Sequence, residues 1–209
     1  MINEPNIELL FPTPVMFNSI DRAFTKQELK YVDKHSKLTY QNAGNTTSLN
    51  NYILEEEEFK DLKQICLDHV NNYIEKIYKP RYKVEPYITM SWLNWTKPNE
   101  YHHTHAHPNS FISGVLYISA NEDEDKIKFH DSGYTQLRLD TDNYDVYNSD
   151  SWWFKVKTGG IVLFPSSLTH NVETVTSKDT RVSLAFNTFL TGTLGDNKAL
   201  TELKLNKGN

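Results

Sequence analysis

The chain has 209 residues and a net charge of −5, and 12% of its residues are aromatic. A chain of this length can bury a substantial core, and its aromatic content argues against disorder. The acidic balance argues against nucleic acid as a partner, because such binding depends on clustered Lys and Arg. We therefore expect one folded domain spanning residues 1–209.

The N-terminal part of the chain, residues 1–80, is predicted to be a mainly helical support. Residues 7–17 read as a short strand that Pro12 and Pro14 interrupt, which places it at the edge of a sheet. An edge of this kind could pair with a second copy of the chain in a homodimer. Residues 41–51 are mostly small and polar and are predicted to form a loop.

Two helices are predicted within this support. Thr25 and Glu28 form a capping-box pattern that opens a short helix ending near Lys37. Residues 55–78 are predicted to form one long helix, because apolar residues recur at three- and four-residue steps and charged residues fill the other side. A helix with one apolar stripe is expected to pack against a sheet.

Cys66 is the single cysteine and falls on the apolar side of the long helix. One cysteine excludes an intramolecular disulfide and suits a reducing compartment. A small buried side chain is the expected role, not a nucleophile. Because no run reaches about 18 apolar residues and no secretory signal pattern begins the chain, we expect a cytoplasmic protein without a membrane partner.

Residues 81–190 have the pattern of a β-rich core, followed by a C-terminal tail over residues 191–209. About eight short strands are predicted there, at residues 82–95, 110–119, 126–130, 134–139, 152–157, 161–164, 170–175 and 181–190. Strands that do not alternate with helices predict an all-β sandwich or barrel, with the helices of the N-terminal third outside it.

Four histidines lie within one seven-residue segment, which reads YHHTHAH. His105 and His107 alternate on an extended backbone, so their side chains would share a face. Two imidazoles held in this way can chelate one metal ion, and a third group from elsewhere would complete the coordination. His170 follows an apolar strand and is the candidate third ligand, while His102 and His103 are expected to line the mouth of the site.

Residues 181–187, RVSLAFN, predict a strand with two unlike faces. Arg181, Ser183 and Asn187 alternate with three apolar residues, so the polar side chains would share one face. An unpaired buried guanidinium is very costly, and its planar fork matches a carboxylate. An organic acid is therefore the expected guest of Arg181.

These segments occur in a fixed order along the chain: LFPTPVM (10–16), HAHPNSFISGVLY (105–117), GIVLFPSSLTH (160–170) and RVSLAFN (181–187). With them the chain resembles the 2-oxoglutarate and Fe(II)-dependent oxygenase superfamily, most closely a branch common in marine bacteria and their phages. The resemblance covers nearly the whole chain. It implies a mainly β fold, a double-stranded β-helix (a jelly-roll or cupin-like barrel) with the N-terminal helices packed outside.

The resemblance implies that His105, His107 and His170 hold Fe(II). Most of the superfamily uses two histidines and one carboxylate, and here the position of the carboxylate is His107. If a carboxylate is required, Asp131 is the candidate, with a turn-forming role as its alternative reading.

For the cosubstrate 2-oxoglutarate, the resemblance implies that Arg181 and Tyr117 bind the distal carboxylate. Ser183 matches the small polar residue two positions after the arginine, and Asn94 is a further candidate contact. With O2 as the second cosubstrate, the implied activity is that of a dioxygenase, in particular a hydroxylase, acting on a small molecule or a peptide. Two alternatives remain open at this point: a three-histidine cupin-like metalloenzyme that does not use 2-oxoglutarate, and a non-catalytic β-barrel binding module with a structural metal.

Overall fold

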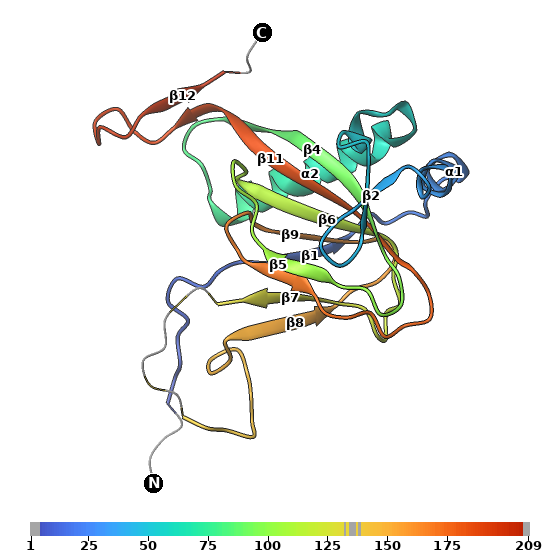
Figure 1. Ribbon diagram of the computed structural model, residues 1–209. Coiled ribbons are helices and arrows are strands. Elements are labelled where there is room, and N and C mark those ends of the chain that lie inside the picture. Colours follow the sequence, from blue (N-terminus) through green and yellow to red (C-terminus); the bar gives the residue numbers. More distant parts are fainter. Residues whose placement is uncertain (1–4, 132, 134–136, 138, 207–209) are drawn as a thin grey trace.

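Two antiparallel sheets face one another in the computed structural model, which describes residues 5–131, 133, 137 and 139–206 (Figure 1). The large sheet has the strand order β1 (Met16–Ser19), β9 (Gly160–Pro165), β6 (Ile112–Ser119), β11 (Arg181–Leu194), β4 (Val84–Thr96), β3 (Thr46–Ser48) and β2 (Thr39–Gln41), with β12 (Leu203–Leu205) paired to β11. The small sheet has the order β5 (His102–His105), β10 (His170–Val172), β7 (Lys126–His130) and β8 (Ser151–Lys155). This arrangement is the jelly-roll double-stranded β-helix that the family resemblance implies.

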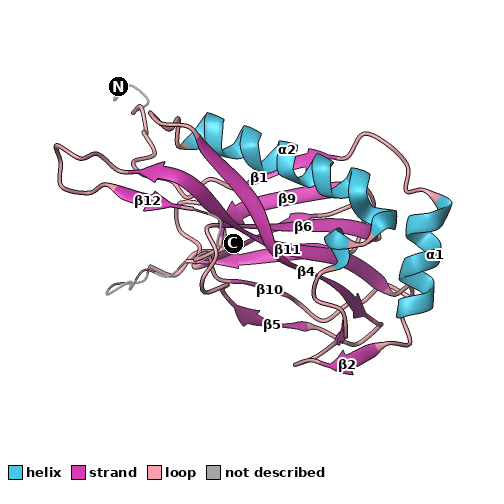
Figure 2. Cartoon of the chain, turned by 90° about the horizontal axis from the view of Figure 1, so that it is seen from above, coloured by secondary structure: helices cyan, strands magenta, loops and turns pink. Residues whose placement is uncertain are grey.

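Helices cover the outer face of the large sheet. They are α1 (Lys26–His35), the short 3-10 turns η1 (Ile53–Glu55) and η2 (Glu57–Phe59), and α2 (Lys60–Ile77). Figure 2 shows α2 lying across the large sheet, on the side away from β5. Among the described residues, no helix combines the length and the apolar character that crossing a bilayer requires.

The capping-box prediction is confirmed. The Thr25 side chain accepts a hydrogen bond from the Glu28 N–H at 3.2 Å, and the Glu28 carboxylate accepts one from the Thr25 N–H at 2.6 Å. Helix α1 then ends at His35. The long helix is shorter than predicted, because the residues before Lys60 form the two 3-10 turns instead.

Alternation along the strands divides the interior into two apolar cores. On β6, Leu116 packs with the helices, whereas Val115 and Tyr117 point into the space between the two sheets. The faces are this distinct because successive side chains of a strand point in opposite directions. The polar residues of β11 therefore point between the sheets, as predicted, and Leu184 and Phe186 point toward the helices.

Close packing on the helix side requires a glycine at position 114. Gly114 lies directly opposite Phe186 in the pairing of β6 with β11. A Cβ atom at this position would overlap the Cζ of the Phe186 ring. The phenyl ring thus occupies the space that any larger residue would need.

Several predicted boundaries are wrong. The loop predicted at residues 41–51 contains β3 and the end of β2, since polar residues there are held by pairing with β4. The strand predicted at 7–17 is reduced to β1, although its position at a sheet edge is confirmed. Beyond residue 190, the predicted tail begins with the end of β11 and contains β12.

Two further differences concern the strands of the small sheet. The sequence prediction missed β5, because its run of histidines has no apolar alternation. The strand predicted at 134–139 lies largely outside the described residues, and residues 137 and 139 are not in a strand.

Candidate metal centre

Three histidines meet at one end of the small sheet. His105 is the last residue of β5, His170 is the first residue of β10, and the antiparallel pairing places them directly opposite one another. His107 follows β5, and its backbone N–H donates to the Ser166 carbonyl at 2.9 Å. That bond fixes the turn that returns the third imidazole to the other two.

The distances between the three rings match those of a mononuclear metal site. The ring centres are 4.4 Å apart for His105 and His170, 4.9 Å for His105 and His107, and 5.1 Å for His107 and His170. The candidate ligand nitrogens all lie within 4.8 Å of one another. With metal–nitrogen distances of about 2.1 Å, two imidazoles on one ion have ring centres about 4.5–5.3 Å apart. The triad therefore needs little rearrangement to bind an ion.

Hydrogen bonds to Nδ1 orient each imidazole. The Nδ1–H of His105 donates to the carbonyl of His103 at 2.8 Å, and that of His170 donates to the carbonyl of Leu168 at 3.0 Å. His107 donates in the same way to the Oδ1 of Asn187. Because these acceptors fix the proton on Nδ1, the Nε2 lone pairs stay free for a metal ion.

Burial keeps the triad neutral. It lowers the pKa of His105 to about 4 and that of His170 to about 3, with repulsion between the neighbouring imidazoles acting in the same direction. Burial also lowers the pKa of His107. At neutral pH no proton has to leave before a metal ion binds, which favours a preformed site.

Asn187 is a functional residue to which the sequence analysis assigned no role. Its Oδ1 accepts from His107 and also from the Ser113 hydroxyl at 2.8 Å. The sequence did contain a sign of this role, because Asn187 lies on the same polar face of β11 as Arg181, opposite the apolar residues with which it alternates. Only the fold shows that this face meets the turn carrying His107.

The predicted cosubstrate residues form a polar row between the sheets. Ser183 lies opposite Asn94 on one side and opposite Tyr117 on the other, so all three share one level of the large sheet. All of them are buried, as is Arg181, which is 3% exposed. The Asn94 side chain already accepts a hydrogen bond from the Thr47 hydroxyl at 2.9 Å.

Arg181 and Tyr117 carry polar atoms that are buried and unsatisfied. The Arg181 Nε has no hydrogen-bond partner, and the Tyr117 hydroxyl has none other than the neighbouring guanidinium, whose carbon lies 5.0 Å from the Tyr117 ring centre. No carboxylate in the described part of the chain lies within ion-pair distance of Arg181. Because buried polar groups are normally paired, the two atoms indicate an anionic guest.

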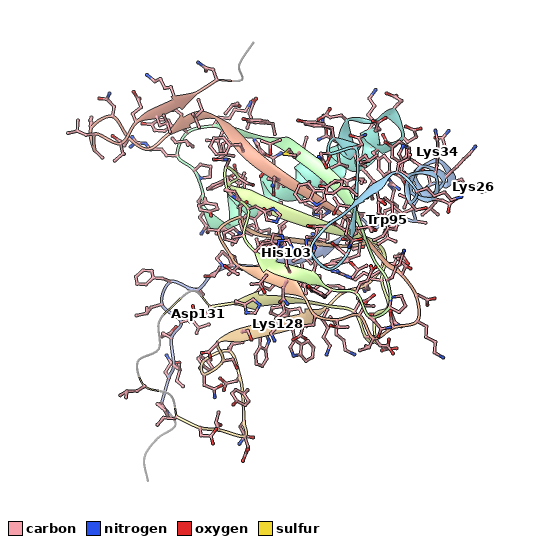
Figure 3. All side chains as sticks on the ribbon, viewed as in Figure 1. Lys26, Lys34, Trp95, His103, Lys128 and Asp131 are labelled. Atoms are coloured by element: carbon pink, nitrogen blue, oxygen red, sulfur yellow. The ribbon has the colours of Figure 1, made fainter. Side chains whose placement is uncertain are left out.

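Asp131 is not part of the triad. It is exposed, and its carboxylate accepts a hydrogen bond from the Gly133 N–H at 3.0 Å. Figure 3 labels Asp131 at the end of β7, away from His103 on β5. This geometry agrees with a turn-forming role for Asp131. Among the described residues, both groups of side chains that could hold a metal ion consist of histidines alone.

A cavity of ≈ 360 Å³ leads to the triad. His102 and His103 line it together with His105 and His107, as expected from the sequence. Burial lowers the pKa of His102 to about 2, and the positive charge of Arg181 contributes to this shift. Arg181 thus acts electrostatically on the histidine cluster although it does not line the cavity itself. The remaining wall is mostly aromatic or amide-bearing and is formed in part by Tyr40, Asn42, Asn51 and Trp92, together with the thioether of Met90.

The fold and the triad define a class: a jelly-roll protein with a three-histidine metal site between its sheets. Residues 90–187 match the model of the family described as "Putative 2OG-Fe(II) oxygenase". This range contains the three histidines, Arg181 and Tyr117. The resemblance to the 2-oxoglutarate/Fe(II)-dependent oxygenases is therefore confirmed over this range.

Solved structures share the fold at low sequence identity. An oxidoreductase of the 2OG-Fe(II) oxygenase family from Burkholderia pseudomallei has a TM-score of 0.56 and 14% identity, with 83% of each chain covered. HygX from Streptomyces hygroscopicus, solved with nickel, 2-oxoglutarate and hygromycin B, has a TM-score of 0.57 and 10% identity, covering 84% of this chain and 82% of its own. A Pseudomonas putida prolyl-4-hydroxylase has a TM-score of 0.53 and 12% identity, covering 84% and 92%. No curated protein matches the chain in sequence.

Proposed function

We propose that the protein couples the oxidative decarboxylation of 2-oxoglutarate to the hydroxylation of a small-molecule or peptide substrate, with Fe(II) held by His105, His107 and His170. When bound, the iron, 2-oxoglutarate and O2 supply the oxidising chemistry: 2-oxoglutarate becomes succinate and CO2, and the second oxygen atom enters a C–H bond of the substrate as a hydroxyl. The observation that carries the proposal is the buried pair of Arg181 and Tyr117, whose Nε and hydroxyl have no hydrogen-bond partner outside the pair.

The protein's own residues hold and orient the reactants. Three neutral imidazoles leave both positive charges of the ion to be balanced by ligands, which favours a dianionic cosubstrate such as 2-oxoglutarate. Arg181 and Tyr117 can each donate to its distal carboxylate, one as a cation and one as a hydroxyl. Their burial excludes water from this end of the site, which strengthens both interactions.

The test is succinate formation from Fe(II), O2 and 2-oxoglutarate by the wild-type protein, without added substrate. Arg181→Ala should raise the 2-oxoglutarate concentration needed for half-maximal turnover by at least tenfold, since a buried charge-assisted bond contributes about 1.5–3 kcal/mol. Iron content should not change. Arg81→Ala is the matched control, because Arg81 is exposed and pairs with Asp196 on the surface.

Three outcomes would contradict this assignment. Loss of iron in Arg181→Ala would place the guanidinium in metal retention instead of cosubstrate binding. A wild-type protein that binds iron but forms no succinate, and whose thermal unfolding is insensitive to N-oxalylglycine, would favour a metalloenzyme that does not use 2-oxoglutarate. Zinc retained through purification, with no turnover of any kind, would favour a non-catalytic binding module.

A further inference from the structure

A second group of three histidines lies beside the first. His102, His103 and His105 have candidate ligand nitrogens within 4.8 Å of one another. Their ring centres are 5.2 Å apart for His102 and His103, 4.7 Å for His102 and His105, and 4.8 Å for His103 and His105. These values fall in the same range of about 4.5–5.3 Å that two imidazoles on one ion require.

An irregularity in β5 brings these three side chains together. His105 pairs with His170, but His102 pairs with Val172, so the segment from His102 to His105 is one residue longer than the facing segment of β10. A bulge of this kind re-aims side chains that regular alternation would send to opposite faces. It allows the neighbours His102 and His103 to approach the same point as His105.

The hydrogen bonds of the described residues reveal no structural role for the His103 side chain. Its Nδ1 is buried and has no hydrogen-bond partner, which is uncommon for a buried polar atom. His102 has one weak contact, 3.3 Å from its Nε2 to the Asn42 side-chain nitrogen. Figure 3 labels His103 on β5, which is an edge strand of the small sheet. Both histidines line the same cavity as His105 and His107, so all four imidazoles are reached through one opening.

We propose that His102, His103 and His105 form an outer position for a divalent transition-metal ion, through which the inner triad of His105, His107 and His170 is loaded. His105 belongs to both positions, and its Nδ1 already donates to the His103 carbonyl, so it offers a single lone pair. His105 can therefore bind an ion at only one of the two positions at a time. It transfers inward when His107 and His170 replace His102 and His103. Neutral imidazoles suit Fe(II), Co(II), Ni(II) and Zn(II) alike, so the outer position is selective for this group of ions over Mg(II) and Ca(II).

The first experiment isolates the outer position with Co(II), whose visible absorption reports its ligands. The double variant His107→Ala, His170→Ala lacks two inner ligands and should still bind one Co(II) per chain. Adding His102→Ala and His103→Ala should abolish that binding. Adding His130→Ala instead should leave it unchanged, because His130 is bonded to Asn171 on another strand and belongs to neither triad. A folded double variant that binds no Co(II), or one whose binding survives the loss of His102 and His103, overturns the proposal.

The second experiment keeps the inner triad intact. In stopped-flow mixing of the apoprotein with Co(II), His103→Ala should slow uptake by about tenfold, because a tenfold loss of affinity at the outer position lowers the fraction of ions held there for transfer by the same factor. The final stoichiometry should stay at one ion per chain. Equal uptake rates in the wild type and in His103→Ala overturn the loading role. Neither experiment involves 2-oxoglutarate, so the result is independent of the proposed oxygenase activity.

Discussion

Asn187 offers the sharpest test of how the fold maintains the inner triad. Its Oδ1 accepts the Nδ1–H of His107, a residue 80 positions away in the sequence. In Asn187→Ala the imidazole loses the acceptor that fixes its tautomer and its ring orientation. The Ser113 hydroxyl, 3.2 Å from the same nitrogen, is the one remaining partner among the described residues, and it loses its own bond to Asn187 in the same variant.

The expected effect is a loss of metal affinity. Removing a group that orients a metal-binding histidine typically lowers affinity by about 10- to 100-fold, or about 1.4–2.7 kcal/mol. The protein should still fold, because the change leaves the main-chain pairing of β11 with β4 and β6 intact. The other two ligands keep their hydrogen bonds to main-chain carbonyls. Asn187→Asp should bind metal about as well as the wild type, since a carboxylate is an equally good acceptor for Nδ1–H.

The assay is a Co(II) competition titration against a chelator, with circular dichroism and thermal unfolding as checks of folding. Asn171→Ala is a matched control. Asn171 accepts from His130 at 2.9 Å in the same kind of amide–imidazole contact, but His130 does not belong to the triad. Equal Co(II) affinities for Asn187→Ala and Asn171→Ala would refute the role assigned to Asn187.

Three further predictions concern stability and reactivity. Gly114→Ala should destabilise the fold by about 1–3 kcal/mol, measured by urea unfolding, because the added methyl group overlaps the Phe186 ring, and Phe186→Leu should relieve part of that loss. Cys66 is fully buried and burial raises its pKa to about 12, so it should not react with Ellman's reagent until the protein unfolds; rapid labelling of native protein would contradict this. Burial opposes ionisation of Glu28, but hydrogen bonds from Arg22 and Thr25 outweigh it and lower the pKa of Glu28 overall. The ionised Glu28 carboxylate should therefore add to the free energy of unfolding above the unfolded pKa of about 4.3, and this stabilisation should be lost as the pH falls from there through the lower folded pKa. Glu28→Gln should flatten that part of the stability–pH curve.

The sequence determined those features that depend on local periodicity. Alternation on β11 placed Arg181, Ser183 and Asn187 on one face, and the apolar stripe of α2 predicted a helix packed on a sheet. The histidine-rich segment and His170 identified the candidate ligands. All these patterns repeat over a few residues, so they can be read without knowing what the strands pair with.

The tertiary structure decided what depends on pairing between distant segments. Opposition of His105 and His170 arises from the pairing of β5 with β10, and the approach of Asn187 to His107 arises from the position of β11 in the other sheet. The bulge that gathers His102 and His103 is likewise a property of two paired strands, not of either strand alone. Cross-strand register is set by the whole fold, because a strand's own sequence does not specify which residue of another strand will face it.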